Sequence, residues 1–231
     1  MQPEVAVVHE PSGWERAGLV RPPVLTAVLT ALTAAVSMAG LISPRVLDAL
    51  ARTPAAVHGQ PWRWITSLVV QDGGVLGTAS NLLFLALLGA AAEQVVGRAT
   101  MVVLYLAAGS TGQLAGVFWQ PVGAGNSVAV CGLAGLVAWS LRDRRMPGWA
   151  GGALALWLGA LLSTWWPPLL AVGIVGTALD RAAARNRPEI RLPAAVIGSV
   201  LIAIVLIAVR NVHGPALAVG TVAGAVAARR R

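Results

Sequence analysis

The chain is 231 residues long, 57% hydrophobic and 11% charged, with a formal net charge of +8. Soluble domains contain roughly 45–50% apolar and about 25% charged residues, so this composition excludes a water-soluble globular domain. All 17 basic side chains are arginines and lie between apolar blocks, which favours a role in membrane topology and argues against nucleic-acid binding. A single cysteine, Cys131, excludes an internal disulfide and a multi-cysteine metal site.

The apolar blocks are long enough to cross a bilayer, which predicts an all-α, polytopic helical membrane protein with about eight spans. Residues 1–22 are polar and are interpreted as an N-terminal tail, either loose or lying on the surface, without a cleavable signal pattern. Residues 23–231 are interpreted as the transmembrane domain. Its first span is predicted at 23–42, and a long connection of mixed character follows at 45–73.

Seven further spans are predicted at 74–92, 100–119, 127–139, two within 148–180, 193–209 and 213–228. The pair within 148–180 is separated by the sequence Trp-Trp-Pro-Pro, which indicates a tight turn. Eight spans place both termini on one side of the membrane. If that side is the inside, the outer segments hold only Arg45, Arg52, Arg63 and Arg210. The other arginines then fall on inner segments, which follows the positive-inside rule and predicts a multi-pass cell-membrane protein with cytoplasmic N- and C-termini.

Ser127 and His213 each begin a predicted span that enters the membrane from the outer face, so they lie at a similar shallow depth. Ionisable residues in spans usually mark a site. A serine beside a histidine is also the minimum for a hydroxyl nucleophile with a general base. The alternative is structural: Ser127 caps a helix, and His213 is an interfacial residue that caps the last one.

Asn81 lies about two turns into the second span from the same outer side. An amide in hydrocarbon needs hydrogen-bond partners, so it either serves a site or bonds to a neighbouring helix. No carboxylate is predicted at that depth, because Asp48 and Asp72 fall in the outer connection and Asp143 and Asp180 on the inner side. The sequence therefore favours a Ser-His dyad over a Ser-His-Asp triad.

Small residues recur every fourth position in the last span, at Ala216, Gly220 and Gly224, and the fourth span offers Gly132 and Gly135. Such faces let membrane helices approach closely. If these faces meet, the side chains of the serine and histidine that open the two spans lie within about 2.6–3.2 Å. The two short spans within 148–180 are then expected at the periphery.

Several motifs resemble those of the rhomboid intramembrane serine proteases, over about 61–135 and 213–224. They are Trp62-Arg63 in the outer connection, Asn81-Leu82-Leu83 with Gly89 and Glu93-x-x-x-Gly97 in the second span, Gly125-Asn126-Ser127 with Gly132 and Gly135 in the fourth, and His213 with Ala216 and Gly220 in the last. The resemblance implies a rhomboid-like core of six spans around a water-filled site open to the outside. The pair within 148–180 would be two extra short spans inserted into that core.

The resemblance also implies roles. Ser127 would be the nucleophile and His213 its general base, while the Ser127 backbone N–H and the Asn81 side chain would form the oxyanion hole, with Asn126 as a further candidate. Such an enzyme would cleave transmembrane protein substrates near the outer face of the lipid bilayer. We expect no metal, no cofactor and no nucleic-acid partner.

Three positions depart from the family pattern. Gly77 stands where the family usually has a second oxyanion histidine, Val128 replaces the glycine after the nucleophile, and Cys131 replaces an aromatic residue one turn below it. Losing one oxyanion donor costs about 10²–10³ in rate. The departures keep open a catalytically weak or inactive rhomboid-like protein that binds membrane clients. A small transporter is disfavoured, because the sequence shows no inverted repeat.

Overall fold

The computed structural model describes residues 11–230, and the regular structure within that range is helical. Eight long helices are α2 (Val24–Ile42), α5 (Gly74–Val96), α6 (Arg98–Trp119), α7 (Ser127–Ser140), α8 (Ala150–Ser163), α9 (Leu170–Asn186), α10 (Pro188–Ala208) and α11 (His213–Arg229). Short helical pieces are α1 (Gly13–Arg16), α3 (Pro44–Leu50), η1 (Pro54–Val57), α4 (Arg63–Thr66) and η2 (Pro167–Leu169). The long helices fall on the eight predicted spans, and α2, α5, α6 and α10 are long and apolar enough to cross a membrane. The chain is a polytopic helical membrane protein.

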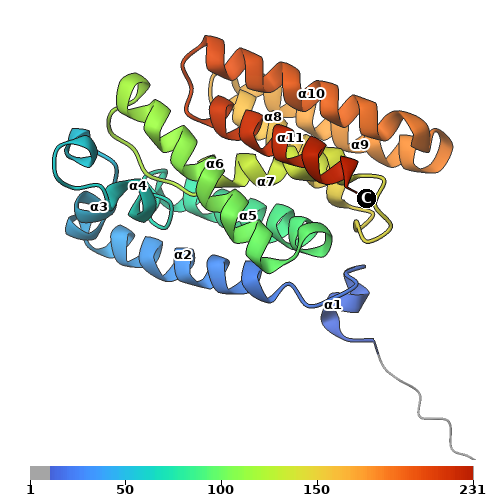
Figure 1. Ribbon diagram of the computed structural model, residues 1–231, viewed down its shortest axis with the longest axis horizontal. Coiled ribbons are helices and arrows are strands. Elements are labelled where there is room, and N and C mark those ends of the chain that lie inside the picture. The colour runs from blue at the N-terminus through green and yellow to red at the C-terminus, as the bar shows by residue number, and fades with distance from the viewer. Residues whose placement is uncertain (1–10, 231) are drawn as a thin grey trace, which may run out of the picture.

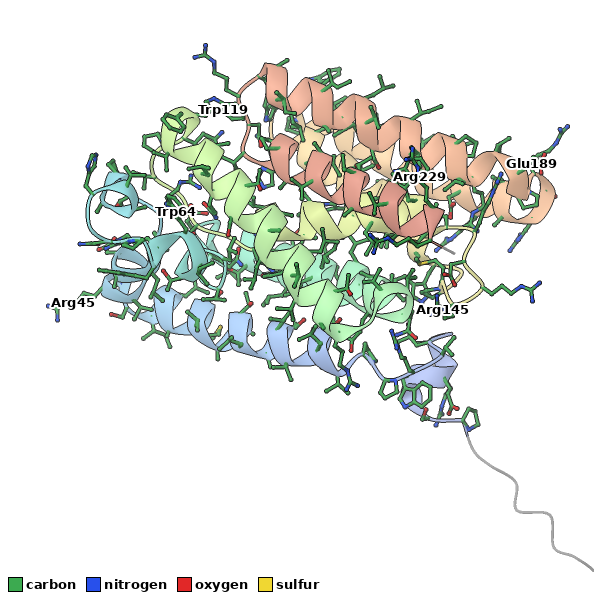
Figure 2. All side chains as sticks on the ribbon, in the orientation of Figure 1. Arg45, Trp64, Trp119, Arg145, Glu189 and Arg229 are labelled. Atoms are coloured by element: carbon green, nitrogen blue, oxygen red, sulfur yellow. The ribbon has the colours of Figure 1, made fainter. Side chains whose placement is uncertain are left out.

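Successive long helices run in opposite directions along the bundle (Figure 1). Figure 1 shows α1 and the C-terminus at one end of the bundle and the connection that contains α3 and α4 at the other. Figure 2 places Arg145 and Arg229 at the first end and Arg45 and Trp64 at the second. The serine and histidine predicted to open the fourth and last spans are the first residues of α7 and α11.

Helix α7 forms the centre of the molecule. It packs against α11, α6 and α5, and nearly all of its residues are buried (Figure 1). A helix that is apolar on every side is expected in such a place, because it has no polar face to turn outward. The 14 residues of α7 span about 21 Å, less than the roughly 30 Å of a bilayer's hydrocarbon core.

The glycine faces predicted on α7 and α11 meet. A Cβ atom added to Gly220 would lie 2.0 Å from the carbonyl oxygen of Gly132, and one added to Gly135 would lie 2.4 Å from the backbone nitrogen of Thr221. Backbone therefore contacts backbone where these helices cross, which confirms the predicted close approach.

Gly220→Val is expected to lower the melting temperature in detergent by at least about 5 °C, because the new side chain must push α11 away from backbone atoms that cannot move independently. Gly198→Val in α10 is the matched control, since a Cβ there meets no atom within 4 Å. Equal melting temperatures for the two variants would contradict the close packing of α7 on α11.

The expectation that both spans within 148–180 are peripheral is wrong for α8. Leu154, Trp157 and Leu161 of α8 belong to the buried core, and the Trp157 ring lies 4.8 Å from that of Phe84 in α5. The expectation is confirmed for α9, whose one buried residue among those described is Gly173. The two segments are similarly apolar at their start, but α9 ends in charged residues and α8 does not, so only α8 can be buried along its length.

The N-terminal segment within the described residues is attached to the bundle. The carboxylate of Glu93 accepts hydrogen bonds from the backbone of Leu25 (3.1 Å) and Thr26 (2.9 Å), so it caps the N-terminus of α2. The indole of Trp149 donates to the carbonyl of Ala17 at 2.9 Å. Of the two alternatives predicted for the tail, residues 11–22 thus follow the second and lie on the surface. Residues 1–10 of the predicted tail lie outside the described range.

Candidate active site

Ser127 and His213 are within hydrogen-bond distance, with 2.9 Å between the serine Oγ and the histidine Nε2. Both side chains are half-buried, so the pair is accessible from one side. The close approach of α7 and α11 brings their first residues together, as the glycine faces predicted. The hydroxyl can donate its proton to a bare Nε2, which is the arrangement that a serine nucleophile and its base require.

The opposite ring nitrogen of His213 faces Asn211, at 2.7 Å between Nδ1 and Oδ1. The same Asn211 oxygen accepts the backbone N–H of His213 at 3.0 Å. An atom that receives a backbone N–H is an acceptor, which assigns it as the amide oxygen and not the nitrogen. Nδ1 must then carry the ring proton and Nε2 the lone pair directed at Ser127.

Sequence reasoning missed Asn211 because the search for a third member was limited to carboxylates. The available signal was a polar side chain in the tight turn two residues before the histidine. That turn is shaped by Arg210, which adopts a left-handed φ of 56°, and by a hydrogen bond from the Asn211 N–H to the carbonyl of Leu206 at 2.8 Å.

The first turn of α7 places backbone N–H groups beside the serine hydroxyl. The N–H of Val130 donates to the carbonyl of Asn126 at 2.9 Å and closes the first turn. The amides of residues 127–129 precede that bond, and a helix provides no acceptor for them. Together with the helix dipole, these amides favour negative charge next to Ser127.

A chain of three side-chain amides runs beside the same spot. The Nδ2 of Asn81 donates to the Oε1 of Gln71 at 2.7 Å, and the Nε2 of Gln71 donates to the Oδ1 of Asn126 at 2.8 Å. A Cβ built on Gly125 would lie 3.3 Å from the Ser127 Oγ and 3.7 Å from the Asn81 Nδ2. Asn81 and the serine thus border one space, which Gly125 leaves open at a φ of 143° that favours glycine.

Gln71 was not identified from the sequence, where it belongs to the long outer connection without a distinguishing pattern. Asn126, the third amide, is fully buried. Its Oδ1 is engaged by Gln71, and its Nδ2 has no hydrogen-bond partner within residues 11–230. The contacts of Asn126 therefore tie α7 to Gln71, and its role as an oxyanion donor stays a prediction.

The three departures from the family pattern have clear structural settings. Gly77 lies one turn before Asn81 on α5, and a Cβ there would meet no atom within 4 Å, so the predicted notch is present. Val128 is buried against Gly112 of α6: a Cβ added to Gly112 would lie 2.3 Å from a methyl carbon of Val128. Cys131 is completely buried in the core.

The loop before α7 is held in place by Arg52, which sequence analysis treated only as an outer arginine. Its guanidinium donates to the side chain of Gln113 and to the carbonyl of Gln120, and its backbone pairs with Gly123 in both directions. Burial lowers the pKa of this guanidinium, and the carboxylate of Asp72 opposes that shift. Arg52 therefore fixes the path of residues 120–125, which end at Gly125 beside Ser127.

The arginine of the Trp62-Arg63 motif has a similar role further out. Arg63 donates through Nη1 to the carbonyls of Asp48 and Ala51, each at 2.7 Å. It thereby joins α4 to the C-terminus of α3 and folds the outer connection into a compact unit. Within residues 11–230 no group of three His, Cys, Asp or Glu side chains is placed to hold a metal ion.

A family model described as the Rhomboid domain matches residues 58–184, which is more than half of the chain. The matched range contains Arg63, Gln71, Asn81 and Ser127 as well as α8 and all but the last two residues of α9, and it ends before His213. A comparison with curated proteins found no match.

Proposed function

The chain belongs to the rhomboid family, and we propose that it is an intramembrane serine endopeptidase that cleaves transmembrane proteins near the outer membrane face. The observation that carries this proposal is the 2.9 Å contact between Ser127 Oγ and His213 Nε2, with Nδ1 of the same ring bonded to Asn211. A serine that merely caps a helix needs no histidine whose tautomer is fixed to accept its proton.

In the proposed reaction, Ser127 Oγ attacks the scissile carbonyl while its proton moves to Nε2 of His213. The tetrahedral intermediate then collapses: its C–N bond breaks, and the imidazolium returns the proton to the leaving amine. A water molecule next attacks the acyl-serine ester with His213 again as base. Serine and histidine are thereby restored, and the carboxylic acid is released.

The negative oxygen of the intermediate would be stabilised by two kinds of donor. The Ser127 backbone N–H lies in the free first turn of α7. Asn81 has two hydrogens on Nδ2, and Gln71 accepts one of them, which leaves the second for the oxyanion. Because Gln71 fixes the plane of that amide, the donor is oriented before the substrate arrives, which is the condition for effective electrostatic stabilisation.

The membrane setting follows from helix length and charge. Since α7 spans only about 21 Å, a nucleophile at its first residue lies below the membrane surface. We place that residue towards the outside and both termini in the cytoplasm of a cell-membrane protein, because the arginine-rich ends of the helices lie at the opposite end of the bundle (Figure 2).

The second candidate function is that of an inactive family member that binds membrane clients, and the empty notch at Gly77 favours it. A fluorophosphonate probe decides between the two, because it forms a covalent bond only with an activated serine. Labelling of the wild-type protein, absent in Ser127→Ala, would support the protease. No labelling of a folded protein would support the binding function.

Asn211→Ala is expected to slow fluorophosphonate labelling of Ser127 by about 10–10²-fold, because the ring of His213 loses the acceptor that fixes its tautomer. The rate should fall less than it does when a triad loses its buried aspartate. A neutral amide orients the ring but does not stabilise the positive charge of the imidazolium. Asn211→Asp keeps an acceptor at this position and should label faster than the alanine variant. Unchanged labelling in Asn211→Ala, at an unchanged melting temperature, would contradict a positioning role.

A further inference from the structure

A cavity lies away from the serine–histidine pair, between α8, α9 and α10. Its volume is about 560 Å³, and it is open on one side. It extends along α8 from Gly151 to Leu162, eleven residue steps or about 16 Å. That length matches the hydrocarbon depth of one membrane leaflet, about 15 Å.

The walls of this cavity are apolar, and they are not closed by other side chains. Leu179 and Val172 of α9 are 63% and 55% exposed, and Ile190 of α10 is 49% exposed. Helix α9 is pressed onto α8 at Gly159 and Gly173, whereas an added Cβ on Gly198 of α10 would meet no atom within 4 Å. The recess is therefore a gap between a tight helix pair and α10, and its walls lack contacts that an apolar occupant would supply.

The polar groups of the cavity gather at one end. Asp180 and Arg191 form a two-point ion pair there, with 2.8 Å from Nε to Oδ1 and 3.1 Å from Nη2 to Oδ2. Arg187 lies beside them at the N-terminus of α10, and its guanidinium has no partner in the described part of the chain. Since Asp180 neutralises Arg191, Arg187 leaves a positive charge at the mouth, and the dipole of α10 reinforces it. Glu189 in the same first turn is exposed and does not line the cavity.

We propose that this cavity binds one anionic phospholipid, with an acyl chain along α8 and the phosphate at Arg187. The apolar length of the recess, its exposed apolar walls and the cation of Arg187 at its mouth together match an amphipathic anion and not a soluble one. Arg145 and Arg229 lie at the same end of the bundle (Figure 2). The headgroup would therefore lie in the membrane leaflet that faces the most basic end of the protein. The site is independent of the proposed protease function.

The test compares ligands on the purified full chain in detergent. Native mass spectrometry should show one phosphatidylglycerol retained per protein, with phosphatidylcholine of the same acyl chains retained about five-fold less. Both lipids carry a phosphate, but the choline cation of phosphatidylcholine offsets its charge and is repelled by Arg187. Glycerol 3-phosphate should not compete at equal concentration. Equal retention of the two lipids, or equal binding of glycerol 3-phosphate, would overturn the proposal.

Two variants test the site of the acyl chain and the site of the headgroup independently. Gly198→Phe fills the recess and should reduce phosphatidylglycerol retention at least ten-fold; unchanged retention would overturn the location. Arg187 is exposed in the turn between α9 and α10, so Arg187→Gln should not disturb packing. This variant should lose the preference for phosphatidylglycerol. Arg210→Gln at the other end of α10 is the matched control and should keep that preference. A preference lost equally in both arginine variants would contradict the role of Arg187.

Discussion

Ser127→Ala is expected to reduce cleavage of a model transmembrane substrate by about 10⁴–10⁶-fold, because it removes the only atom that forms the acyl intermediate. The side chain contributes one hydrogen bond, to His213, and it is half-buried, so the variant should keep its fold. The measurement is product formation by the purified protein in detergent, with the melting temperature recorded alongside.

Ser163→Ala provides a matched control for that experiment. Ser163 is the half-buried last residue of α8, and its hydroxyl donates to the carbonyl of Ala160 within its own helix, at 2.7 Å. It should leave cleavage unchanged. Equal residual cleavage by the wild type and Ser127→Ala would refute the protease. No cleavage by either, with substrate still bound, would favour the client-binding function.

The parts of the fold that the sequence predicted well were those determined by composition and spacing. Continuous apolar blocks located the eight long helices. A helix that spans the bilayer needs about 20 apolar residues, and a helix buried inside the bundle is apolar but can be shorter. The four-residue spacing of Gly220 and Gly224 predicted the contact with α7, because close helix crossing excludes a Cβ on one face. The proximity of Ser127 and His213 followed from these two facts and the direction of the spans.

The parts that the sequence did not predict depend on contacts between segments without a pattern of their own. Gln71 reaches both Asn81 and Asn126 from an outer connection that Arg63 holds together and Arg52 ties to the bundle. Helices α8 and α9 were treated alike in the sequence analysis, although the charged end of α9 sets it apart from the uniformly apolar α8. Asn211 needed the turn geometry, in which one amide oxygen serves both the backbone and the ring of His213.

Asn81→Ala is expected to lower kcat by about 10²–10³-fold with little change in KM, because an oxyanion donor acts in the transition state and not on the bound substrate. The effect should lie at the upper end of that range here. Gly77 contributes no side chain, so the remaining donors are the α7 amides. Substrate cleavage by purified protein, with kcat and KM measured separately, tests this expectation.

The same helix provides the variant that distinguishes catalysis from packing. Asn81 also donates to Gln71 at 2.7 Å, so its removal leaves a buried carbonyl without a partner and lowers stability under either explanation. Gly77→His adds a donor one turn away, into space where a Cβ meets no atom within 4 Å, without restoring the bond to Gln71. If Asn81 stabilises the oxyanion, Gly77→His should recover part of the kcat lost in Asn81→Ala while the melting temperature stays low. If Asn81 only joins helices, specific activity should survive Asn81→Ala and gain nothing from the histidine, which would contradict its place in the oxyanion hole.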